Sequence, residues 1–178
     1  MRGVLVAALF VAATVVRADD KGTVVTIAGM KSATPADWKE ETPSSSMRMA
    51  QFKLPAAEGD KDGAELAVFK MTASGSVDQN LDRQRAMFLP AQGKDKVEEK
   101  KDKLKVGTVE ATYLDLTGTF KKKESPMAEK FTPVAGQRLL YVVFDSKEGD
   151  SFYLRLLGPE KTVDKNKKAF EEWLKNFK

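Results

Sequence analysis

The sequence predicts a single α+β domain in which an antiparallel β-sheet is sandwiched between helices. The first observation is a strand, residues 137–145, that is apolar on both faces, with Leu139, Tyr141 and Val143 on one and Leu140, Val142 and Phe144 on the other. Such a strand must be covered on both sides. The second is a C-terminal segment in which apolar residues recur at helical spacing as far as Phe177. Together they indicate a sheet packed against helices.

The first 18 residues predict a secretory signal peptide that precedes this domain. Arg2 provides the positive end, an apolar run extends from Val4 to Val16, and Val16 and Ala18 occupy the −3 and −1 positions of a signal-peptidase site. The run is shorter than the roughly 20 apolar residues of a membrane-spanning helix. We therefore expect residues 19–178 to form the mature domain outside the cytoplasm, periplasmic or secreted, with no stable membrane insertion.

The first half of the domain predicts a short strand, a hairpin and a helix. Residues 23–27 are rich in β-branched side chains, and residues 46–54 alternate in polarity. A polar turn at residues 58–63 separates that strand from a second one at residues 65–72, which favours a hairpin. Ser76 and Gln79 fit a capping box at a helix start, and Pro90 prevents the helix from continuing.

The second half predicts four strands, one long loop and a closing helix. Residues 97–104 and 108–120 are expected as strands around Gly107, and residues 137–145 and 151–157 as a hairpin. Between these pairs, residues 121–136 contain lysines, prolines and a glycine and predict a loop. Gly158 and Pro159 then break the sheet before the final helix.

The composition argues against an enzyme. The chain has no histidine and no cysteine, which excludes Ser-His-Asp and Cys-His nucleophiles, imidazole acid–base catalysis and disulfides. Removal of Arg2 and Arg17 with the signal peptide leaves 28 of the 30 basic residues against 26 acidic ones. The two signs are interspersed, so no nucleic-acid site is expected. We expect no cofactor. A hydrolase or lyase that uses carboxylates, or a structural component of the cell envelope, is the alternative.

One acidic turn is a weak candidate for a metal site. Glu58, Asp60 and Asp62 match the first, third and fifth positions of a calcium-binding loop. The twelfth position, which should hold a bidentate glutamate, falls on Phe69 within a strand. A plain acidic turn is therefore the preferred interpretation.

Five other residues are candidates for ligand or partner contacts. Arg48, Asp115 and Arg155 are charges within strands, and a charge in a covered strand must be paired or must reach the rim. Asp115 shares a polar strand face that can meet Arg48 or Arg155 across the sheet. We expect a structural ion pair or an exposed face there, with a ligand pocket built on an Arg–Asp pair as the alternative. Met127 and Phe131 lie in the expected loop 121–136 and suit a docking segment, with a floppy insertion as the alternative.

Several stretches resemble a family of uncharacterised secreted bacterial proteins of planctomycete type. The matching stretches are Trp38-Lys39, residues 45–52, Leu54-Pro55, residues 64–69, residues 75–77, residues 80–83 with Phe88, and residues 158–163. More distantly, the order of strands and the closing helix look like the PsbP-like α/β/α sandwich. That fold includes a non-enzymatic extrinsic subunit of the photosynthetic oxygen-evolving complex. The resemblance implies a non-enzymatic binding or accessory protein, whose partner is an unknown protein or small molecule of the cell envelope.

Overall fold

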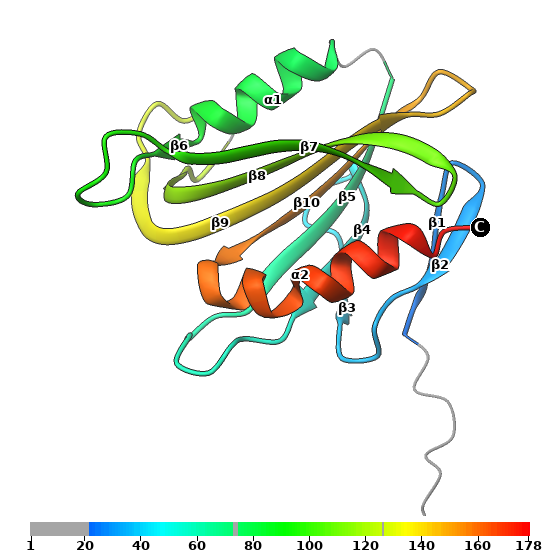
Figure 1. Cartoon of the computed structure of the whole chain (residues 1–178), viewed down its shortest axis with the longest axis horizontal. Helices are drawn as coiled ribbons and strands as arrows, with labels where there is room; N and C mark the ends of the chain where they lie inside the picture. The colour runs from blue at the N-terminus through cyan, green and yellow to red at the C-terminus, as the bar shows by residue number, and fades with distance from the viewer. Residues whose placement is uncertain (1–21, 73–74, 126) are drawn as a thin grey trace, which may run out of the picture.

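The computed structural model describes residues 22–72, 75–125 and 127–178, so the expected signal peptide at residues 1–18 lies outside the described residues. Figure 1 shows a curved sheet with its strands between two helices that lie apart. In chain order the elements are β1 (Val24–Ile27), β2 (Met30–Ala33), β3 (Lys39–Glu41), β4 (Arg48–Leu54), β5 (Ala64–Met71), α1 (Val77–Ala86), β6 (Phe88–Leu89), β7 (Glu98–Val106), β8 (Val109–Lys122), β9 (Thr132–Asp145), β10 (Ser151–Pro159) and α2 (Glu160–Lys175).

The described strands form one large antiparallel sheet and one separate hairpin. The large sheet has the order β3–β4–β5–β10–β9–β8–β6, and β7 pairs with β8 beside β6. The hairpin consists of β1 and β2. The predicted hairpins β4–β5 and β9–β10 are confirmed, and the two strands expected on either side of Gly107 are found as β7 and β8, which pair with each other. Local turns therefore determine most of the neighbours in this sheet.

The central strand β9 is buried on both faces, as its pattern predicts. Leu140, Val142 and Phe144 belong to one apolar cluster, which includes Val163, Phe170, Trp173 and Leu174 of α2. Leu139, Tyr141 and Val143 belong to a second cluster, which includes Leu81 of α1 and Phe88 of β6. Because neighbouring residues of a strand point to opposite faces, β9 contributes to both clusters. We refer below to the α2 face and the α1 face of the sheet.

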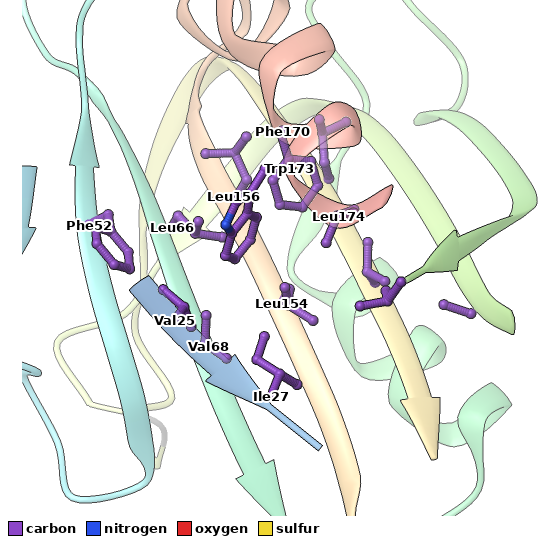
Figure 2. Packing of buried hydrophobic residues seen from close by; sticks show 14 of the residues in the cluster. Val25, Ile27, Phe52, Leu66, Val68, Leu154, Leu156, Phe170, Trp173 and Leu174 are labelled. Atoms are coloured by element: carbon purple, nitrogen blue, oxygen red, sulfur yellow. The ribbon is translucent and has the colours of Figure 1, made fainter. Parts of the chain in front are cut away.

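The antiparallel sheet and two helices are confirmed, but the helices do not form two full layers. They contain only 10 and 16 residues. On the α2 face the remaining cover comes from the hairpin β1–β2, whose Val25 and Ile27 join the same cluster. Figure 2 shows side chains from β1, β4, β5, β10 and α2 gathered there. This hairpin replaces part of a helical layer because its β-branched residues bury one face.

Two other expectations about the elements need correction. The expected loop 121–136 is wrong at both ends, because β8 continues to Lys122 and β9 already begins at Thr132. The two strands pair beyond the core, with Lys121 opposite Pro133 and a bulge between Gly118 and Phe120. An exposed hairpin arm needs no apolar alternation, so its lysines and prolines obscured the strand. Likewise the helix expected to continue towards Pro90 already ends at Ala86, and Phe88 lies in the short strand β6.

Candidate functional site

A groove of about 590 Å³ runs between strand β7 and helix α2. The lysines that line it are Lys100, Lys103, Lys105, Lys167 and Lys175. Asp102 and Glu171 also line it, together with Leu104 and Tyr113. Since five of the lining residues are basic and two are acidic, the lining has an excess of positive charge, which attracts anions. Leu104 and Tyr113 add an apolar surface for the body of a ligand.

Strand β7 presents these side chains to the groove through its register with β8. Lys100 lies opposite Asp115, Asp102 opposite Tyr113, and Leu104 opposite Ala111. These three β7 residues therefore share the α2 face. Lys103 and Lys105 alternate with them, so they border the groove at the outer edge of β7. Charged side chains suit β7 because, among the described strands, it pairs with β8 alone. Lysines on such an edge also discourage unwanted strand pairing.

Gly107 fixes the closed end of the groove. It begins the two-residue turn between Val106 and Val109 with a φ of 58°, a conformation that favours glycine. Its N–H donates to the carbonyl of Leu174 at 2.8 Å. A Cβ atom at this position would lie 2.3 Å from the Phe177 carbonyl oxygen. Glycine thus permits the turn to approach the end of α2.

The groove lysines differ in how far their charge is already neutralised. The Nζ atom of Lys100 lies 3.5 Å from Asp102, that of Lys103 lies 3.2 Å from Glu110, and that of Lys167 lies 2.8 Å from Asp115. Across residues 22–72, 75–125 and 127–178, Lys105 and Lys175 form no ion pair. These two side chains are therefore the ones most available to an anionic ligand.

Asp115 is a buried carboxylate of β8 that contacts Lys167, one of the groove lysines, and Arg138 of β9. It is 6% exposed, and both carboxylate oxygens accept from Arg138, at 2.8 Å from Nε and 2.6 Å from Nη2. Lys167 donates to the same carboxylate, and Arg138 also pairs with Asp164 of α2. Burial alone would raise the pKa of Asp115, but the hydrogen bonds from Arg138 and Lys167 outweigh burial and hold the pKa below its usual range.

The hydroxyl of Tyr113 is a donor at the base of the groove. Burial raises its pKa, and the nearby charges of Asp115 and Glu171 raise it further. The hydroxyl therefore stays protonated at neutral pH, and it donates to Glu171 at 3.2 Å. Asp115, for its part, is ionised and already bound by two cations. Neither group is free to remove a proton from a substrate, so the arrangement suits the binding of a charged ligand better than acid–base catalysis.

The expectation that Asp115 meets Arg48 or Arg155 is wrong, although Asp115 is indeed in an ion pair. Asp115 lies opposite Leu140, which lies opposite Leu156, so Asp115 points to the α2 face. Arg155 is the neighbour of Leu156 and points to the α1 face. Arg48 also lies on the α1 face, where it pairs with Glu65 at 2.9 Å. The sequence pattern did not reveal this because strand order decides which residues share a face.

The acidic turn proposed as a metal site caps a helix instead. Asp60 accepts from the backbone N–H of Thr162 at 3.1 Å and from its hydroxyl at 2.7 Å. Helix α2 has Pro159 at its N-cap position and no capping side chain of its own, so Asp60 satisfies one of its free N–H groups. Glu58 and Asp62 are exposed. Across the described ranges, no three acidic, histidine or cysteine side chains are grouped to hold a metal.

Met127 and Phe131 lie in the turn between β8 and β9 and are 91% and 42% exposed. Lys121 lies over the ring of Phe131, with Nζ 5.6 Å from the centroid. This turn is separate from the groove between β7 and α2. The docking role expected for Met127 and Phe131 stays a prediction.

Sequence reasoning missed the lysines of the groove. Residues 98–106 contain four lysines with no helical or strand-like apolar pattern beyond Leu104, and they were interpreted as part of a solvated surface. Lys167 and Lys175 are eight residues apart on α2, which places them on one side of the helix. That spacing indicates two lysines on one side of α2, but the sequence does not show that this side of the helix packs beside β7 to form a groove.

Comparison with known proteins places the chain among structures with the PsbP-like fold. It matches CyanoP, the cyanobacterial PsbP of Synechocystis sp. PCC 6803, with a TM-score of 0.52 over 90% of this chain and 93% of that chain. It also matches LpqN, a Mycobacterium tuberculosis protein involved in cell envelope biogenesis, with a TM-score of 0.50 over 88% and 83%. Sequence identity is 15% in both cases, so the likeness shows the fold alone.

No family model and no curated protein matches the sequence. The resemblance to secreted planctomycete-type proteins therefore stays a prediction. Among the described residues, neither helix is long and apolar enough to cross a bilayer.

Proposed function

We propose that this chain is a non-catalytic accessory protein that acts outside the cytoplasm and holds an anionic partner in the groove between β7 and α2. The observation that carries the proposal is the groove itself. It has a volume of about 590 Å³ and a lining of five lysines against two carboxylates. Charge of one sign in a concave site concentrates ligands of the opposite sign.

The state of the charged side chains supports a binding role over a catalytic one. Asp115 is engaged by Arg138 and Lys167, and Tyr113 donates to Glu171. A hydrolase or lyase built on an Arg–Asp pair would need its carboxylate free to accept a proton from the substrate or from water. The groove lysines, by contrast, need no change of partner to bind an anion through Lys105 and Lys175.

The location outside the cytoplasm rests on the expected signal peptide. The fold is consistent with it, because LpqN, which shares the fold, is involved in cell envelope biogenesis. The partner is accordingly expected in the cell envelope. Acidic proteins and anionic envelope polymers both have the chemistry that the groove favours.

The groove is tested by reversing its two unpaired charges. Binding of poly-glutamate, an acidic probe, is measured by calorimetry for the purified protein and for the double variant Lys105→Glu/Lys175→Glu. The matched control is Lys130→Glu/Lys147→Glu, which makes the same change of net charge at exposed residues of two turns. Each exposed charge pair contributes up to about 1 kcal/mol, so we expect roughly tenfold weaker binding for the groove variant.

The control variant should bind poly-glutamate nearly as well as the original protein. Added salt should weaken binding, because the Debye length is only about 8 Å at 0.15 M. Equal losses in the two variants would show a general charge effect and would contradict the groove as the binding site.

A further inference from the structure

A second positively charged region lies on the opposite face of the sheet, around Arg155. This residue is in the middle of β10, between Ala67 of β5 and Tyr141 of β9. Its side chain points to the α1 face and is half-buried. The guanidinium carbon lies 5.4 Å from the centroid of the Phe120 ring. A ring contact of this kind uses the flat face of a guanidinium and leaves its N–H edges for other partners.

Arg155 differs from Arg48, Arg85 and Arg138 in that it forms no ion pair with a carboxylate among the described residues. Arg48 pairs with Glu65, Arg85 with Glu99, and Arg138 with Asp115. Within the described ranges, Arg155 forms neither a hydrogen bond nor an ion pair. Burial lowers its pKa, with Glu65 opposing this effect and Arg48 adding to it. A charge withdrawn from water without a partner is costly, so this position favours an added anion.

The surroundings of Arg155 are also positive. Arg48 from β4 lies close enough to repel it, whereas Glu65 is occupied by Arg48. On the other side, Arg83 of α1 and Arg155 both act on the buried hydroxyl of Tyr141. Arg48 and Glu65 therefore act on Arg155 from the neighbouring strands, and Glu65 is the one carboxylate among the groups that act on it.

We propose that Arg155 anchors an oxyanion-binding site on the α1 face, which holds the carboxylate or phosphate group of a small ligand. The planar guanidinium matches both groups, since each can accept two parallel hydrogen bonds from it. Phe120 keeps the guanidinium in place, and Arg48 adds positive charge from the neighbouring strands. This site is distinct from the groove between β7 and α2, because Arg155 and the groove lie on opposite faces.

Thermal unfolding in the presence of simple anions tests the site. The purified protein is melted in sodium phosphate and in sodium acetate, each compared with sodium chloride at equal ionic strength. We expect phosphate, acetate or both to raise Tm by about 3 °C or more at saturating concentration. The response to each anion identifies the group that the site accepts. No rise with either anion would overturn the proposal.

Three variants locate the effect. Arg155→Met should lose the rise in Tm, whereas Arg85→Met, which removes a half-buried guanidinium that is paired with Glu99, should keep it. The groove variant Lys105→Glu/Lys175→Glu should also keep it. A response that survives in Arg155→Met, or that disappears only in the groove variant, would overturn the site at Arg155.

If Arg155→Met does not fold, the site can still be tested with the original protein. Titration with phosphate or acetate is then followed by ¹⁵N NMR, which resolves the Arg155 Nε–H signal and the amides of Ala67 and Tyr141. Saturable shifts of these signals support the site. Shifts confined to the groove residues, or none at all, overturn it.

Discussion

At the scale of single residues, the buried charges decide which side chains remain available for binding. Asp115 holds Arg138 and Lys167, and Arg48 holds Glu65. These contacts satisfy most of the charge inside the strands. Lys105 and Lys175 of the groove lining and Arg155 on the α1 face form no ion pair with the described residues, so we propose them as ligand contacts. Their proposed role in binding rests on the absence of a neighbouring carboxylate that pairs with them.

We predict that Asp115→Asn destabilises the protein by about 3 kcal/mol at pH 7. Removing one member of a buried ion pair typically costs about 3–5 kcal/mol, and Arg138 and Lys167 retain some contact with water. Asp95→Asn, at an exposed position in the loop before β7, is the control and should change stability little. Urea unfolding of both variants and the original protein measures the difference.

The same carboxylate makes stability depend on pH in one direction. The pKa of Asp115 is lower in the folded protein than its usual value of 3.8, so the stabilisation is present above the unfolded pKa. It is lost as the pH falls through the folded pKa. Acidification below about pH 4 should therefore destabilise the original protein more than Asp115→Asn. A parallel loss of stability in the two proteins would contradict this role.

At the scale of elements, helix α2 depends on a loop that is distant in sequence. The loop between β4 and β5 surrounds the start of the helix, where Asp60 caps Thr162 and the carbonyl of Pro55 accepts from Asn166 at 3.1 Å. The end of α2 is held by Gly107 of the β7–β8 turn. The groove lies between these two attachments, so its shape depends on both of them.

We predict that Asp60→Ala destabilises the protein by about 1 kcal/mol, because it leaves a free N–H in the first turn of α2. Asp62→Ala, two residues away on the same turn, is the matched control. Asp62 is exposed, so its replacement should change the free energy of unfolding by less than about 0.5 kcal/mol. Equal losses in chemical denaturation would show that the charge of the turn matters and its cap does not.

At the scale of the whole molecule, one sheet separates the two proposed binding regions. The groove opens on the α2 face and the Arg155 patch lies on the α1 face. Neither face is closed by a full helical layer, since α1 and α2 are short and a hairpin completes the cover beside α2.

We expect the chain to be exported through its predicted signal peptide, and a substitution at the cleavage site tests this. Ala18→Arg should block processing of the full-length chain, because the −1 position of signal peptidase takes small side chains. Mass spectrometry of the exported protein should find an N-terminus at Asp19 for the original sequence and an unprocessed chain for the variant. A mature N-terminus far from Asp19 would contradict the expected signal peptide.

Elements with strong local patterns could be predicted from the amino-acid sequence. The two-sided apolar strand at β9, the capping box of Ser76 and Gln79, and the apolar stripe of α2 were all predicted correctly. Periodicity and capping depend on residues a few positions apart, so they can be read along the chain. The exposed arm of β8 and β9 has no such pattern, which is why residues 121–136 were taken as a loop.

The ion pairs between strand and helix residues could not be predicted from the sequence, because they join residues that only the folded chain brings together. Asp115 reaches Arg138 and Lys167, 23 and 52 residues away, and Arg155 is left without a carboxylate among the described residues. The order of strands in the sheet determines these partners. A shift of the strand register by one residue would move each side chain to the opposite face and give it different neighbours. The groove likewise exists because α2 packs beside β7. Local spacing encodes the shape of each element, whereas the sites arise where distant elements come together.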